Sequence, residues 1–170
     1  HERVLRARLE DAKFFYRSDR AVPLDRQVEK LKNVLFQAQL GSVYDKVRRV
    51  QALARYVAEQ SGADADFCRQ VERAAWLCKA DLVSQVVGEF PKLQGVMGRV
   101  YAGVQGEPAA VATAIEEHYR PTASGGALPE TPAGAVLASA DKMDTICGCF
   151  RAGLVPTGAA DPYALRRQGI

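Results

Sequence analysis

The sequence predicts an all-α fold, a bundle of about seven or eight helices. Apolar residues recur three or four positions apart through most of the 170 residues, which is the spacing of one face of an α-helix. Serine, aspartate and threonine caps and proline or glycine breaks divide the chain into segments of helical length. No segment alternates apolar and polar residues over four to eight positions, so we expect no β-strand.

Two helices are expected near the N-terminus. Residues 2–19 place apolar side chains on one face and charged side chains on the other, which is typical of an amphipathic helix. Pro23 separates this segment from a second helix. The apolar stripe of that second helix is expected to consist of Val28, Leu31, Val34 and Leu35.

N-cap residues mark the starts of the next two helices. Ser42 has Asp45 three positions after it, a spacing that predicts a capped helix start. Asp64 is the predicted cap of the fourth helix. We expect this fourth helix to continue into the segment around Asp81.

Prolines indicate where the remaining helices begin and end. Pro91 and Pro108 are each expected in the first turn of a helix, and the second of these helices should end before Pro121. Thr131–Pro132 predicts the cap and first position of a long helix. Asp161–Pro162 is expected to start the last helix.

The cysteines indicate the compartment. No CxxC pair occurs among the four cysteines, and with two histidines there is no zinc-finger spacing. Cys68, Cys78 and Cys147 fall on apolar helix faces, and we expect them to be buried thiols. No segment has the pattern of a signal peptide or a membrane span. We therefore expect a protein of the reducing cytoplasm with no membrane partner.

Asp81 is the most unusual residue of the sequence. It interrupts a segment that is otherwise apolar on one side. A carboxylate in such surroundings needs a partner, a metal or an altered pKa. Lys79, Lys142, the amides of a helix end and tyrosine hydroxyls are its possible partners. The sequence carries no P-loop, GxGxxG or GxSxG motif that would suggest another site.

Several short motifs around Asp81 and along the whole chain resemble one family. They are KADL at 79–82, VGEFPKLQG at 87–95, EEHYRP at 116–121, LPETP at 128–132, ADKMDT at 140–145 and DPYALRR at 161–167, with RVLRARL at 3–9 and EKLKNV at 29–34 upstream. In this order they resemble the bacterial glycyl-tRNA synthetase beta subunit. Lys92 departs from the family, which usually has an acid there.

The resemblance implies that residues 1–170 form a single HD-like helical domain, excised from a longer beta subunit. It implies part of an ATP-dependent ligase that joins glycine to its tRNA. The partners would be glycine tRNA, the alpha subunit and the remainder of the beta subunit. ATP and magnesium would be used in the alpha subunit, so this chain would hold no cofactor and no catalytic residue. Its expected role is to contact tRNA.

Domains of the HD superfamily bind divalent metals through histidines and aspartates from several helices, and these metals activate water against phosphate esters. By resemblance, Asp81, His118 and Asp141 occupy positions of that ligand set. Ala80 stands where the paired histidine would be, so we expect a degenerate site without metal. A working metal-dependent phosphohydrolase is the alternative interpretation.

Charge indicates where tRNA would bind. The net charge is +3, and residues 1–50 carry 12 lysines and arginines against 7 acids. Basic side chains contact phosphates without reading sequence. The candidates are Arg3, Arg6, Arg8, Lys13, Lys30, Lys32, Arg48, Arg49, Arg166 and Arg167. The alternatives are that these residues are solvated helix faces, and that the domain is a purely structural spacer.

Overall fold

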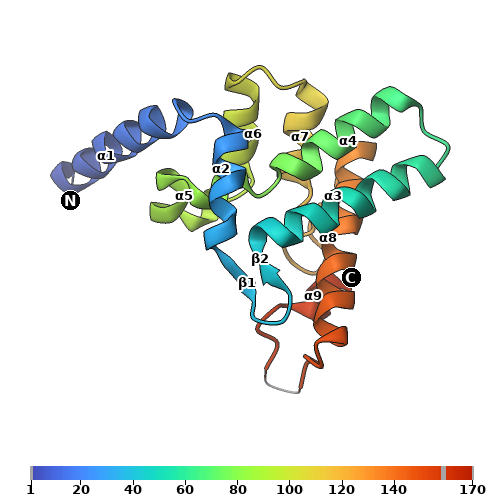
Figure 1. Cartoon of the computed structure of the whole chain (residues 1–170). Coiled ribbons are helices and arrows are strands. Elements are labelled where there is room, and N and C mark those ends of the chain that lie inside the picture. Colours follow the sequence, from blue (N-terminus) through green and yellow to red (C-terminus); the bar gives the residue numbers. More distant parts are fainter. Residues whose placement is uncertain (1, 158–159, 170) are drawn as a thin grey trace.

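Nine α-helices build the described part of the chain, which confirms the all-α class and exceeds the seven or eight helices predicted. The computed structural model describes residues 2–157 and 160–169, without the side chains of residues 3–5. The helices are α1 (Glu2–Arg20), α2 (Leu24–Lys30), α3 (Val43–Gln60), α4 (Ala65–Leu77), α5 (Gln85–Glu89), α6 (Val96–Val104), α7 (Ala109–Glu117), α8 (Pro132–Arg151) and α9 (Leu165–Gln168) (Figure 1).

The predicted helix caps are confirmed. At the start of α3, Ser42 Oγ accepts the Asp45 amide at 3.1 Å, and the Asp45 carboxylate accepts the Ser42 amide at 2.8 Å. Asp64 accepts a backbone amide of the first turn of α4. Thr131 caps α8, with Pro132 at its first position. These contacts satisfy amides that the start of a helix otherwise leaves unpaired.

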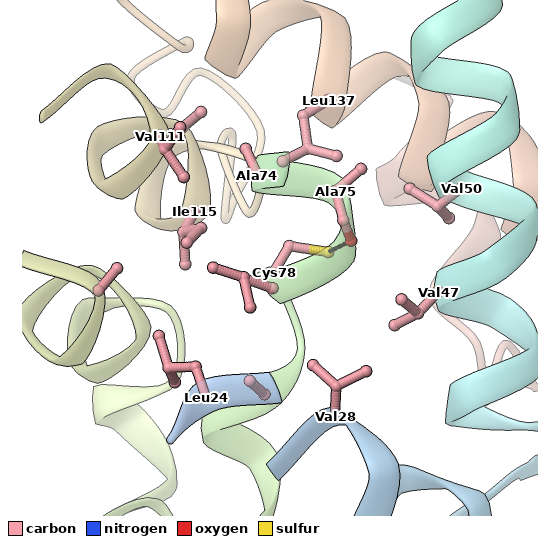
Figure 2. Packing of buried hydrophobic residues seen from close by; sticks show 14 of the residues in the cluster. Leu24, Val28, Val47, Val50, Ala74, Ala75, Cys78, Val111, Ile115 and Leu137 are labelled. Atoms are coloured by element: carbon pink, nitrogen blue, oxygen red, sulfur yellow. Dashed lines mark hydrogen bonds between the residues drawn. The ribbon is translucent and has the colours of Figure 1, made fainter. Parts of the chain in front are cut away.

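One hydrophobic cluster joins the helices around α4. Helix α3 packs against α4 and α8, and α7 packs against α4, α6 and α8. Val47, Val50, Ala74, Ile115 and Leu137 are fully buried where these helices meet (Figure 2). They face inward because apolar positions repeat every three or four residues along each helix. Helix α1 instead reaches away from the other long helices (Figure 1).

A short hairpin corrects the prediction of no strand. Strand β1 (Leu35–Gln37) pairs antiparallel with β2 (Gly41–Ser42). The predicted stripe of the second helix is therefore wrong at its end: α2 stops at Lys30, and Leu35 is 70% exposed in β1. Gly41 has a φ of 86°, which lets the chain turn back toward α3. Strands this short fall below the length at which alternation is detectable.

The segment around Asp81 is also less regular than predicted. Helix α4 ends at Leu77, a 3₁₀ turn follows at Ala80–Val83, and α5 then begins at Gln85. A residue far away in the sequence stabilises this break between α4 and α5. The buried carboxylate of Asp19, at the end of α1, accepts the amides of Gln85 and Val86, each at 2.9 Å. No periodicity in the sequence reveals such a partner.

Two further helix starts lie later than predicted. Pro91 begins a 3₁₀ turn, Pro91–Leu93, and α6 begins only after Gly95, whose φ is 83°. Asp161 does not begin a helix directly. Its carboxylate accepts the amides of Leu165, at 2.7 Å, and Arg166, at 3.0 Å, so it caps α9 from four residues upstream.

One of the predicted buried cysteines is exposed. Cys78 is buried and Cys68 is partly buried, but Cys147 is exposed. Cys149 is buried in its place, because it follows Thr145 by four residues on the inner face of α8. Among the described helices, none is both long enough and apolar enough to cross a bilayer.

Candidate functional site

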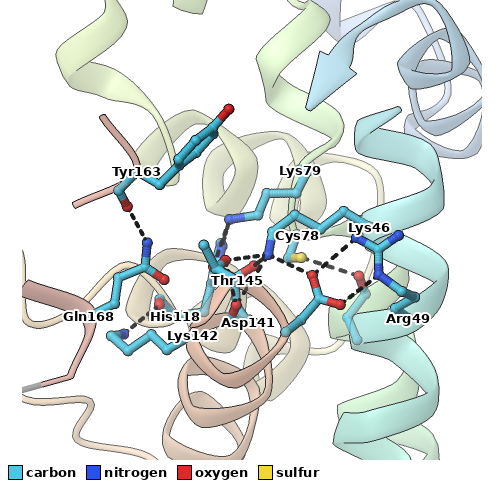
Figure 3. Close-up of polar contacts among 12 residues, drawn as sticks. Lys46, Arg49, Cys78, Lys79, His118, Asp141, Lys142, Thr145, Tyr163 and Gln168 are labelled. Carbon is cyan, nitrogen blue, oxygen red and sulfur yellow. Dashed lines mark hydrogen bonds and ion pairs between the residues drawn. The ribbon is translucent and has the colours of Figure 1, made fainter. Parts of the chain in front are cut away.

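A basic cavity of about 370 Å³ lies where α3, α7, α8 and the α9 region meet. Its cations come from four places in the chain: Lys46 from α3, Lys79 from the turn after α4, Lys142 from α8 and Arg167 from α9. His118 and Asp141, two of the predicted site residues, line the same cavity. Figure 3 shows the three lysines, His118 and Asp141 converging from separate elements.

Lys79 lies between the two predicted residues. Its Nζ is 2.8 Å from His118 Nε2 and 3.1 Å from Asp141 Oδ2, and it lies 4.1 Å from the centre of the Tyr119 ring. His118 Nδ1 lies 2.6 Å from the carbonyl oxygen of Ile115. Because a carbonyl only accepts, Nδ1 carries the proton and Nε2 accepts from the ammonium.

The surroundings keep His118 neutral. Burial, and after it the charge of Lys79, hold the pKa of His118 well below its usual range. Its ring is fully buried. At neutral pH this histidine is therefore uncharged, and its Nε2 accepts a hydrogen bond from Lys79.

Lys46 connects α3 to two carboxylates of α8. Its Nζ is 3.1 Å from Asp141 Oδ1, 3.1 Å from Asp144 Oδ2 and 2.7 Å from Thr145 Oγ1. Arg49 adds a two-pronged contact to Asp144, at 2.7 and 3.3 Å. Burial alone would raise the pKa of Asp141, but the charges of Lys79 and Lys46 outweigh it and hold the pKa far below its ordinary value.

Lys142, unlike Lys46 and Lys79, contacts backbone carbonyls and no carboxylate among the described residues. Its Nζ donates to the carbonyl oxygens of Arg120, at 2.7 Å, and His118, at 3.3 Å. Burial lowers the pKa of Lys142. Arg167 is exposed and also lines the cavity. Positive charge therefore exceeds negative charge here.

Asp81 lies outside this cluster. Its Oδ2 accepts the amides of Gly95 at 2.6 Å and Gly98 at 3.1 Å, so helix-end amides are its partners. Its other predicted partners, Lys79 and Lys142, bind elsewhere. Burial raises the pKa of Asp81, against the hydrogen bond from Gly95. Oδ1 has no hydrogen-bond partner in the described part of the chain.

These residues do not fit a divalent metal. The ammonium of Lys79 lies between His118 and Asp141, the two predicted ligands that approach each other, while Asp81 binds backbone amides. Within residues 2–157 and 160–169, no three histidine, cysteine or acidic side chains are grouped to hold a metal ion. A cation would be repelled by the lysines already present.

The candidate tRNA contacts lie on α1, α2, the turn after α2, α3 and α9. Arg6, Arg8, Lys13, Lys30, Lys32, Arg48, Arg166 and Arg167 are exposed. Lys13 and Lys32 pair with Glu10 and Glu29, and Arg49 is committed to Asp144. The side chain of Arg3 lies outside the described ones.

The sequence analysis missed Lys46 as a residue of this site and considered Lys79 and Lys142 only as partners of Asp81. One signal was available for Lys46. It precedes Val47 and follows Val43 by three positions, on the buried stripe of α3. A lysine on an apolar stripe is rarely buried without a partner, so it indicates a polar cluster.

Comparison with known protein sequences shows the family of this chain. The family described as "Glycyl-tRNA synthetase beta subunit" matches residues 1–170. Proteins named glycine–tRNA ligase beta subunit from Desulforapulum autotrophicum, Trichlorobacter lovleyi and Geotalea uraniireducens are 59%, 58% and 57% identical over the whole chain. The chain spans only 24% or 25% of the length of these relatives. It belongs to the glycyl-tRNA synthetase beta subunit family.

Proposed function

We propose that this chain is a non-catalytic, tRNA-contacting domain of a glycine–tRNA ligase beta subunit. It is a single HD-like helical domain that works in the cytoplasm with the alpha subunit and the rest of the beta subunit. It supports the ATP-dependent attachment of glycine to tRNA, and the chemistry with ATP and magnesium takes place in the alpha subunit. The names of the relatives and the degenerate metal position support this assignment.

Exposed cations without acidic partners carry the proposal. Arg8, Lys30 and Arg48 are exposed on α1, α2 and α3, and none pairs with a carboxylate among the described residues. A basic side chain that already pairs with an acid adds little affinity for a phosphate. An unpaired basic side chain neutralises the phosphate and so releases the counterions that were condensed on the RNA. These three residues are therefore the strongest candidates for contacts to the tRNA backbone.

The test uses the complete enzyme, alpha with full-length beta subunit. The triple variant Arg8→Ala, Lys30→Ala and Arg48→Ala is titrated with glycine tRNA across a salt series. We expect weaker binding and a plot of log affinity against log salt that is shallower by about one unit for each phosphate that the variant no longer neutralises. Adenylate formation, measured by ATP–pyrophosphate exchange, is expected to be unchanged.

A matched control removes the same charge from paired positions. Arg55, Arg69 and Arg99 each contact a carboxylate, so Arg55→Ala, Arg69→Ala and Arg99→Ala should leave the salt slope unchanged. Equal slopes for the two triple variants would contradict tRNA contact and favour a structural spacer. A loss of pyrophosphate exchange in the first variant would contradict the non-catalytic role.

A further inference from the structure

We infer that the basic cavity between α3, α7, α8 and α9 is a binding site for a phosphate monoester. This inference does not rest on the phosphate contacts proposed for Arg8, Lys30 and Arg48, although it uses Arg167, which is also one of the tRNA-contact candidates named from the sequence. Two sources could present such a group, a free nucleotide and the phosphorylated 5′ end of an RNA. The charge, the free donors and the size of the cavity all support the same ligand chemistry.

The charges of the cluster do not balance. Five cations, Lys46, Arg49, Lys79, Lys142 and Arg167, face three carboxylates, Asp141, Asp144 and Asp161, the last of which lies within electrostatic reach of Arg167. His118 is neutral and does not change this excess. The excess lies on Lys142, which is half-buried, and on Arg167, which is exposed, so both charges are accessible to a ligand that enters from solvent. An anion in the cavity would supply the missing negative charge.

The acid that lines the cavity does not oppose an anion. Lys46 lies 3.1 Å from one oxygen of Asp141, and Lys79 lies 3.1 Å from the other. A lysine therefore offsets the charge at each oxygen, although Oδ1 accepts no hydrogen bond within the described residues. The uncompensated charge belongs to Lys142, which contacts only backbone carbonyls, whereas Arg167 also interacts with the charge of Asp161.

Three side chains that line the cavity, Lys142, Tyr119 and Arg167, still have hydrogen-bond donors to offer a ligand. Lys142 uses two of its three N–H bonds, which leaves one. Tyr119 accepts a bond from Gln94 Nε2 at 2.7 Å, so its hydroxyl hydrogen is left to donate. Burial raises the pKa of Tyr119 well above its ordinary value, and the hydroxyl stays protonated. The guanidinium of Arg167 suits a two-pronged contact to phosphate oxygens.

Size and shape favour the end of a nucleotide over a continuous backbone. The volume of about 370 Å³ is at the lower end for small-molecule sites. Phe36 and Tyr163, whose ring centres are 6.1 Å apart, form one aromatic side of the cavity. Such rings accommodate a sugar or base attached to the phosphate. A monoester also carries more negative charge than the phosphodiester of a continuous strand.

The first experiment titrates the 170-residue chain with inorganic phosphate and with adenosine monophosphate at constant ionic strength. We expect saturable binding, weakened about tenfold by Arg167→Ala. Arg26→Ala is the matched control, because Arg26 is exposed on α2 and contacts no acid among the described residues. It should leave binding unchanged. Tyr119→Phe, which keeps the ring over Lys79, should also weaken binding several-fold.

The second experiment separates the two sources. Two RNAs of identical sequence, one with a 5′ monophosphate and one with a 5′ hydroxyl, are compared on the chain and on Arg167→Ala. A preference for the monophosphate that Arg167→Ala removes identifies an RNA end. Binding of adenosine monophosphate without that preference identifies a free nucleotide.

The inference is wrong if neither phosphate, the nucleotide nor the phosphorylated RNA end binds above a chloride control. It is also wrong if Arg26→Ala weakens binding as much as Arg167→Ala. Either result would leave the salt-slope test with Arg8, Lys30 and Arg48 unaffected, so the two proposals fail separately.

Discussion

At the scale of single residues, the imidazole of His118 has its charge state decided by its neighbours. It is fully buried and accepts a hydrogen bond from Lys79, and a proton on Nε2 would meet that ammonium at 2.8 Å. In the unfolded chain the same ring titrates near its ordinary pKa of about 6.5. The native state therefore binds fewer protons than the unfolded state below that pH.

This difference predicts that folding stability falls as the pH drops below about 6.5. Because the pKa is depressed in the native state, the stabilisation is complete above the unfolded value and is lost as the solution becomes more acidic. We expect His118 to contribute a loss of about 1.4 kcal/mol per pH unit until its native pKa is reached. Urea unfolding from about pH 7.5 to about pH 5 measures this slope.

The variant His118→Gln isolates that contribution. Glutamine does not titrate, so the difference in unfolding free energy between wild type and variant should shrink toward low pH. His1 is present in both proteins and cancels. If the unfolding free energies of wild type and His118→Gln changed in parallel with pH, the pKa of His118 would not be lowered in the native state.

At the scale of elements, a close approach between α6 and α7 depends on Gly98. A Cβ placed there would lie 2.7 Å from Ile115 Cγ2 and 3.3 Å from Asp81 Oδ2. The same glycine donates its amide to Asp81 at 3.1 Å. The absence of a side chain therefore lets α6 reach both α7 and the buried carboxylate.

We expect Gly98→Ala to lower the free energy of unfolding by about 1 to 3 kcal/mol, because both neighbours are buried and cannot move freely. Gly103 on the same helix is the control. A Cβ at Gly103 meets no atom within 4 Å, so Gly103→Ala should stabilise the protein by up to about 1 kcal/mol. Chemical denaturation of both variants checks this, and equal effects would contradict the close packing.

At the scale of the whole molecule, the charged cluster connects segments far apart in the chain. Lys46 on α3 and Lys79 after α4 both contact Asp141 on α8, and Lys79 also contacts His118 beside α7. These elements already share a hydrophobic core. These polar contacts can all form only when the helices are packed in one particular arrangement.

Removing Lys46 should be destabilising. Lys46→Met leaves Asp144 with Arg49 alone and Asp141 with Lys79 alone, so each carboxylate keeps one cation but buried acceptors lose a hydrogen bond, at a cost of about 1 to 3 kcal/mol. Lys13→Met, which breaks an exposed pair with Glu10, should change stability by less than about 1 kcal/mol. Thermal unfolding distinguishes the two, and similar small effects would show that Lys46 is not held in the cluster.

Local features of the fold were predictable because their partners are close in sequence. Ser42, Asp64 and Thr131 each bind an amide three residues ahead, and a cap of this kind can be identified from the residue type and the spacing. The break before α5 was not predictable, because the carboxylate of Asp19 that stabilises it lies 66 positions upstream.

The sequence by itself determined the all-α class, the capped starts of α3, α4 and α8 and the family, since these depend on local spacing and on ordered motifs. Only the tertiary structure decided which charges meet. Lys79 and Asp141 are 62 positions apart, and Lys46 and Thr145 are 99 apart. No local pattern pairs them, because their approach follows from how α3, α7 and α8 pack around a common core.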